Sequence, residues 1–124
     1  ERLHELYRQY RGQADFLTIY IREAHPTDEW QMTANETESV CYRQPHTTAA
    51  RGALAHDFRS RYHYERPLLV DAIDNPADRL YAGWPERFYI LNADGTIAYK
   101  GKTGPFGFHP EEVEAWLKAR QAAP

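Results

Sequence analysis

The sequence predicts an α/β domain in which helices flank a sheet of mixed strand direction. Short β-branched and aromatic runs alternate with segments whose apolar residues recur at helical spacing, which is typical of this class. The last two runs flank the turn sequence NADG, so at least one pair of strands is expected to be antiparallel. A length of 124 residues suits one domain over residues 1–124.

The first part of the chain contains one helix, one strand and a long polar segment. Apolar residues at helical spacing, followed by Gly12, predict a helix over residues 2–11. The run FLTIYI over residues 16–21 predicts a buried strand. Residues 22–46 are polar and lack periodicity, and a segment of this length in a compact domain is typical of a functional loop.

The middle of the chain predicts a helix, a strand and a short helix. Residues 47–62 begin with two threonines suited to capping and then place their apolar residues on one helical face. Residues 68–70, which read LLV, predict a short buried strand. Asn75 is expected to cap a short helix whose first turn contains Pro76.

The C-terminal part predicts a hairpin followed by a helix. Residues 88–91 and 96–99 are apolar runs joined by a turn that contains Asp-Gly. Residues 101–109 form a glycine-rich loop. Pro110 then begins the last helix, with Val113, Trp116 and Leu117 expected to face inward.

Composition excludes several classes of partner. The net charge of −3 arises from 15 basic and 18 acidic residues mixed along the chain, which argues against a nucleic acid or an anionic membrane surface. No apolar run approaches the roughly 18 residues of a membrane span, so we expect a soluble protein, with the cytoplasm as the favoured compartment. The single Cys41 excludes an intramolecular disulfide, and no spacing of Cys and His predicts a metal site.

Three segments carry a family resemblance. They are residues 19–30 (IYIREAHPTDEW), residues 84–90 (WPERFYI) and residues 99–108 (YKGKTGPFGF). Together they resemble the iodothyronine deiodinases and their bacterial relatives, and E-A-H-P-x-D-x-W is the most specific part. The resemblance implies a thioredoxin-like fold of the peroxiredoxin type, with Pro85 where that fold places a cis proline.

The chain departs from this family at its most reactive group. The family's nucleophile, a selenocysteine or cysteine, lies on a strand-to-helix turn before the helix that opens this chain, and nothing in the sequence matches it. Because that strand is central in the fold, we expect the first, central strand to be missing from a chain truncated at its N-terminus. A strand supplied by another chain and a sheet closed over the gap are the alternatives, since unpaired central edges are costly.

Four candidate site residues follow from the resemblance, three at the end of the first strand and one, His46, just before the next helix. His25 would transfer a proton, and Glu23 would adjust the proton affinity of His25. Both follow the strand end where α/β sheets hold ligands. Tyr20 resembles the family's strand tyrosine, with core packing as the alternative. His46 resembles a histidine implicated in the family's catalysis, and an exposed histidine at a helix entry is the alternative.

Arg87 and Pro85 are the candidate substrate-binding residues. Arg87 matches the family's arginine beside the substrate cleft, and a guanidinium can bind a carboxylate or phenolate with two parallel hydrogen bonds. The alternative for Arg87 is an ion pair with Glu86, Asp71 or Asp74. Pro85 would lie next to the substrate on account of its cis bond.

The resemblance implies a deiodinase-like oxidoreductase that removes iodine from iodinated phenols with an upstream chalcogen nucleophile. Cys41, within five residues of His46, is a candidate redox thiol, with an inert cysteine as the alternative. Thioredoxin or another thiol reductant would supply electrons, no bound cofactor is expected, and a homodimer is a property of the family. A peroxiredoxin-like thiol oxidoreductase and a non-catalytic module that binds a ligand or partner are the alternative functions.

Overall fold

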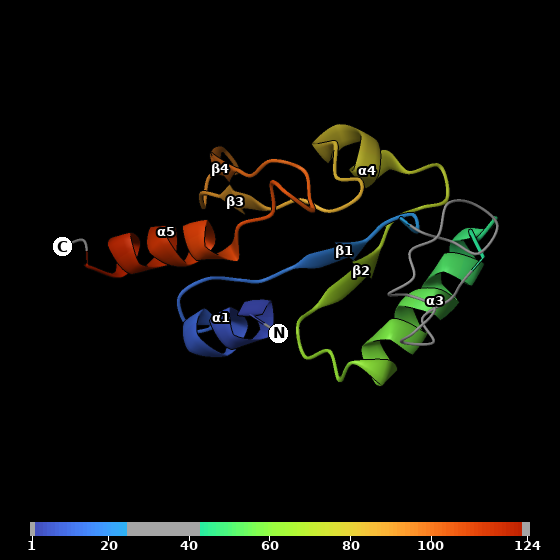
Figure 1. The fold of residues 1–124 in the computed structure, drawn as a ribbon, viewed down its shortest axis with the longest axis horizontal. Coiled ribbons are helices and arrows are strands. Elements are labelled where there is room, and N and C mark those ends of the chain that lie inside the picture. The colour runs from blue at the N-terminus through green and yellow to red at the C-terminus, as the bar shows by residue number, and fades with distance from the viewer. Residues whose placement is uncertain (1, 25–42, 123–124) are drawn as a thin grey trace.

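The computed structural model describes residues 2–24 and 43–122 (Figure 1). Helices and strands alternate as the sequence predicts, so the α/β class is confirmed. The elements of the described residues are α1 Arg2–Tyr10, β1 Thr18–Tyr20, α3 Thr48–Arg61, β2 Leu68–Val70, α4 Pro76–Tyr81, β3 Tyr89–Leu91, β4 Ile97–Lys100 and α5 Pro110–Ala122.

The strands form two separate pairs. β1 and β2 are parallel, with Ile19 opposite Leu69, and β3 and β4 are antiparallel, with Ile90 opposite Tyr99. Within the described residues, no strand of one pair is hydrogen bonded to a strand of the other. The predicted single mixed sheet is therefore not continuous there. The thioredoxin-like arrangement and the missing central strand stay predictions.

Each pair has one edge directed toward the other pair. In the view of Figure 1, β1 and β3 are the inner strands, and β2 and β4 are the outer ones. Thr18 donates to Pro67 O at 3.0 Å and Tyr20 O accepts from Asp71 at 2.9 Å, so the backbone groups of Ile19 between them face away from β2. Among the described strands, none pairs with this inner edge of β1, whose geometry is suited to another strand.

The hydrophobic core lies between α1, α5 and the hairpin. Leu6 and Tyr10 lie one turn apart on α1, and Val113 and Leu117 are spaced in the same way on α5, so each helix turns one apolar stripe inward. The partly buried residues packed against these four are Leu3, Ala14, Phe16, Phe88, Ile90, Tyr99 and Trp116. Among the described residues, no helix combines the length and apolar character needed to cross a membrane.

The strand β1 is shorter than the predicted run over residues 16–21. Phe16 precedes it and packs edge-on against Tyr7 of α1, with ring centroids 5.6 Å apart. Phe16 thus packs against the core, and the ladder with β2 begins at Thr18. The chain continues into β1 only where backbone pairing with β2 begins.

Aromatic packing joins α3 to β1 and β2. The Phe58 ring lies 5.9 Å from that of Tyr20 and 5.2 Å from that of Tyr64. The Tyr64 and Thr18 hydroxyls are 2.6 Å apart, which adds a hydrogen bond to the same contact. At the other end of α3, Thr47 caps the helix as predicted, because its hydroxyl accepts from the Ala50 backbone at 3.0 Å.

The predicted cap of α4 is wrong in its mechanism. Asn75 precedes the helix in left-handed conformation, with φ of 59°, and its side chain makes no capping bond. The Asn75 side-chain oxygen instead accepts from Arg51 at 2.8 Å. The carboxylate of Asp71, which follows β2, caps the helix by accepting from Ala77 and Asp78, both at 3.0 Å.

The hairpin turn has the chemistry that its sequence predicts. Gly95 adopts φ of 88°, a conformation that a side chain disfavours. The Asp94 carboxylate accepts from the backbone of Thr96 at 3.0 Å and from its hydroxyl at 2.6 Å. These local bonds explain why this element could be predicted from four residues alone.

The core predicts that replacing two different leucines with alanine changes the free energy of unfolding by very different amounts. Leu6→Ala removes a side chain that is 0% exposed, so it should lower the free energy of unfolding by about 2–5 kcal/mol. Leu80→Ala is the matched control, since Leu80 is 84% exposed and should change it by less than about 0.5 kcal/mol. Urea denaturation measures both, and equal losses would contradict this core.

The cap of α4 predicts that two Asp→Asn substitutions differ in their effect on stability. Asp71→Asn replaces one carboxylate oxygen with an NH₂ group that cannot accept a hydrogen bond, so one of the two bonds to α4 is lost at a cost of about 2 kcal/mol. Asp74→Asn is the control, because its exposed side chain has no part in this cap. Thermal unfolding should separate the variants, and a cap supplied by Asn75 would make Asp71→Asn harmless.

Candidate functional site

Two candidate residues meet at the carboxyl end of β1. The Tyr20 hydroxyl donates a hydrogen bond to Oε1 of Glu23, and Tyr20 also packs against Phe58 of α3. Three positions separate the two residues, so the chain turns directly after the strand to bring the carboxylate over the phenol. Tyr20 therefore packs against α3 and makes a polar contact as well, and its role in a site stays a prediction.

The electrostatic surroundings of Glu23 favour its protonated form. Burial raises the pKa of the Glu23 carboxyl, because a charged carboxylate is poorly solvated there. The hydrogen bond from Tyr20 and the positive charge of Arg51 act in the opposite direction and are smaller. A carboxyl with raised proton affinity, held against a phenol, is suited to general acid–base chemistry.

The side chain of Gln44 binds both the backbone N–H and the backbone carbonyl of Glu23. Glu23 N donates to Oε1 of Gln44 at 3.0 Å, and Nε2 of Gln44 donates to Glu23 O at 3.2 Å. Gln44 lies two residues before His46. The segment that carries His46 is thereby attached to the strand end that carries Glu23.

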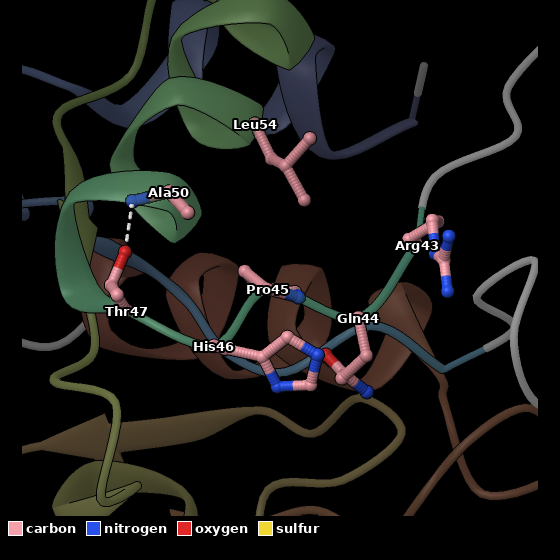
Figure 2. A pocket seen from close by; sticks show the side chains of 7 residues that line it. All are labelled: Arg43, Gln44, Pro45, His46, Thr47, Ala50 and Leu54. Carbon is pink, nitrogen blue, oxygen red and sulfur yellow. Dashed lines mark hydrogen bonds between the residues drawn. The ribbon is translucent and has the colours of Figure 1, made fainter.

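A cavity of about 500 Å³ opens beside this attachment (Figure 2). It is lined by Arg43, Gln44, Pro45, His46, Thr47, Ala50 and Leu54. Figure 2 shows the side chains of Gln44 and His46 extending to the same side of their segment. His46 is exposed at the entry to α3, so its ring is accessible to a ligand in the cavity.

Buried Arg51 is a residue of the site region that the sequence did not reveal. It lies on α3, is 1% exposed, and donates to the carbonyl oxygens of Asp71 and Ala72 at 3.1 and 2.7 Å. Asn75 accepts its third bond. The only signal in the sequence was an arginine within the predicted apolar helix, and an exposed arginine gives the same signal.

A second missed cluster surrounds Asp78 of α4. Its carboxylate accepts from Arg22 Nε at 2.9 Å and from the backbone of Trp84 at 3.0 Å. The Arg22 guanidinium also lies over the Trp84 ring, 4.9 Å from its centroid. Asp78 thus links the residue before Glu23 to the segment that contains Pro85.

Arg87 uses its guanidinium for backbone contacts. Its Nε donates to Gly101 O at 2.7 Å and its Nη1 to Ala82 O at 3.1 Å. Within the described part of the chain it forms no ion pair with Glu86, Asp71 or Asp74, so that alternative is wrong. The Trp84–Pro85 bond is cis, as the resemblance implied. Substrate binding by Arg87 and Pro85 stays a prediction.

His25 and Cys41 lie outside the described residues, so their predicted roles stay predictions. The structure brings Tyr20 and Glu23 together directly and joins His46 to them through Gln44. It places Arg87 with the hairpin and the end of α4. In the described parts of the chain, no three His, Cys, Asp or Glu side chains gather as a group that could hold a metal ion.

Comparison with known proteins gives one consistent result. The family model described as Iodothyronine deiodinase matches residues 1–121. Type I iodothyronine deiodinase of Xenopus laevis is 37% identical over 118 residues, which are 95% of this chain and 44% of that protein. Type II iodothyronine deiodinase of Rattus norvegicus is 33% identical over 116 residues, which are 92% of this chain and 43% of that protein.

Thyroxine 5-deiodinase of Bos taurus is also similar, with 35% identity over 113 residues, 91% of this chain and 36% of that protein. The chain therefore spans less than half the length of these curated relatives. The matched region contains both members of the Tyr20–Glu23 pair, His46 and Arg87. On the match to its family model over nearly its whole length, this chain belongs to the iodothyronine deiodinase family.

Proposed function

We propose that this chain is the redox domain of a deiodinase-like oxidoreductase that removes iodine from an iodinated phenol. The observation that carries the proposal is the part-buried Tyr20–Glu23 pair at the carboxyl end of β1, in a chain that matches the family model over residues 1–121. The relatives are named for deiodination of iodothyronines, and we extend that substrate class to this chain as part of the proposal.

The proposed reaction is a reductive substitution of iodine by a proton. A selenolate or thiolate attacks iodine, a chalcogen–iodine bond forms, and the carbon–iodine bond breaks with its electron pair left on the ring carbon. That carbon takes up a proton. Two equivalents of a thiol reductant then release iodide and regenerate the nucleophile, and the thiols are oxidised to one disulfide.

Proton transfer in this reaction is assigned to the acid–base groups at the end of β1. Glu23 holds its proton to higher pH than an ordinary glutamate, and Tyr20 is in direct contact with it. His46 lines the neighbouring cavity, and an imidazole ring can both donate and accept a proton. We assign His25 to the same proton pathway because the resemblance implies it.

We place the nucleophile on a strand between β1 and β3. The inner edge of β1 carries the backbone groups of Ile19, and Gly101 donates to Phe88 O at 3.0 Å, so the backbone groups of Tyr89 face the inner edge of β3. One inserted strand would pair with both edges and join the two sheets. Its carboxyl end would then lie beside Tyr20 and Glu23 if it runs parallel to β1.

The substrate is proposed to lie between this nucleophile and the Trp84–Pro85 segment. The chalcogen would be the reacting group. The cavity beside His46 would provide an apolar wall, and the Arg87 guanidinium would provide positive charge. The reductant is proposed to be thioredoxin or a smaller dithiol. A homodimer stays part of the family-based proposal.

An iodide-release assay tests the function. We expect the protein that includes the nucleophile to release iodide from an iodophenol in the presence of a dithiol. His46→Asn should lower kcat by about 10²-fold, because it removes a proton-transfer group. His56→Asn is the matched control, since His56 is an exposed histidine on α3 and should leave the rate unchanged.

Three outcomes would contradict the proposal. Consumption of peroxide without iodide release would favour a peroxiredoxin-like oxidoreductase, and turnover of neither substrate would favour a binding module. Iodide release by the 124-residue chain alone, abolished by Cys41→Ser, would place the nucleophile at Cys41 and not on an inserted strand.

The raised pKa of Glu23 predicts a pH-dependent stability. In the folded state the protonated carboxyl is favoured, so this contribution is complete below the ordinary glutamate pKa and is lost as pH rises through the raised one. Glu23→Gln is neutral at every pH. Its melting temperature relative to wild type should therefore increase between about pH 4 and pH 8.

Thermal scans across this pH range measure the difference, with Glu86→Gln as the control because the Glu86 side chain is exposed. A constant difference between Glu23→Gln and wild type would mean that the Glu23 carboxyl titrates normally. A decrease with pH would mean that hydrogen bonds to the carboxylate outweigh its burial.

A further inference from the structure

We propose that Gln44 is a positioning residue that sets the location of Glu23 relative to His46. Its carboxamide binds the two backbone groups of Glu23, and its own segment continues directly to His46. The inference deepens the proposed function, on which the acid–base roles of Glu23 and His46 rest. The geometry that it describes can be tested without that function.

The contact resembles one rung of a β-ladder. Gln44 Oε1 accepts from Glu23 N at 3.0 Å while Gln44 Nε2 donates to Glu23 O at 3.2 Å, so one planar amide satisfies a donor and an acceptor of the same residue. Two bonds in one plane fix orientation as well as distance. They connect positions 21 residues apart in the sequence, which local backbone bonds cannot do.

Gln44 holds the backbone of Glu23 and leaves its carboxylate for other partners. The carboxylate accepts a hydrogen bond from the Tyr20 hydroxyl, and the positive charge of Arg51 acts on it. Gln44 therefore determines where the carboxyl lies without competing for its proton. This division of contacts distinguishes a positioning residue from a proton-transfer group.

The connection from Gln44 to His46 is short and stiff. Pro45 lies between them, and its ring restricts the backbone torsion φ. Thr47, directly after His46, accepts a bond from Ala50 and so fixes the chain to the start of α3. We call the two hydrogen bonds between the Gln44 side chain and the Glu23 backbone the Gln44 clip. The backbone of His46 is thus held between this clip and the helix cap at Thr47.

Hydrogen exchange of the full chain, followed by NMR, tests the inference. In Gln44→Leu the Glu23 amide loses its acceptor and should exchange about tenfold faster, the ratio for one hydrogen bond. The Asp71 amide, which donates to Tyr20 O at 2.9 Å in the neighbouring ladder, should keep its rate. Gln121→Leu is the matched control because Gln121 is exposed on α5.

A second readout follows the Glu23 carboxyl and His46 ring resonances through a pH titration. Gln44→Leu should move the Glu23 midpoint toward the ordinary glutamate value, because a released strand end exposes the carboxyl to water. Gln44→Glu keeps an acceptor for the Glu23 amide and loses the donor to Glu23 O. It should therefore preserve protection of that amide, which is the rescue expected of a clip.

Two results would overturn the inference. An unchanged Glu23 exchange rate in Gln44→Leu would show that the clip does not hold the backbone. Equal acceleration at Glu23 and Asp71 would show a general loss of stability in place of local positioning. Absence of iodide release from the wild-type protein would overturn only the proposed function, since neither NMR measurement needs a substrate.

Discussion

The Asp71 carboxylate accepts hydrogen bonds from the backbones of Ala77 and Asp78, and through them it fixes α4 to the end of β2. Asp78 in turn accepts from Arg22, at the end of β1, and from Trp84. Each carboxylate is less than a tenth exposed, so losing one of these partners would leave a buried acceptor poorly satisfied. The relative positions of the strand ends that carry the candidate site therefore depend on Asp71 holding α4.

Arg51 supplies a positive charge that acts on Glu23 and lies against the residues that follow β2. Its guanidinium is almost fully buried and binds two carbonyl oxygens and Asn75, so its charge is fixed in place and poorly screened by solvent. The pKa of Glu23 is nevertheless raised. Burial of the carboxyl thus outweighs both the attraction of Arg51 and the bond from Tyr20. A site arranged in this way favours a carboxyl that carries a proton, which is the form that a general acid requires.

The elements that the sequence predicted well are those with local causes. The hairpin turn follows from Asp94 and Gly95, and Thr47 caps α3 through a residue three positions away. Asn75 was assigned the wrong role, because its partner comes from Arg51, 24 positions earlier, and no local pattern reveals such a partner. The same limit applies to the candidate site. The strand-end position of Tyr20 was predictable, whereas the clip from Gln44 required two distant segments to be placed together.

The contacts around Glu23 separate position from chemistry. The side chain of Gln44 binds the backbone of Glu23, and the carboxylate of Asp78 binds Arg22. These contacts determine where the strand end lies, and neither uses the carboxylate of Glu23. The carboxylate is left to Tyr20, a group that can itself donate or accept a proton. A carboxyl held through its backbone can change protonation state without losing its place. This property is what repeated proton transfer at the end of β1 would require.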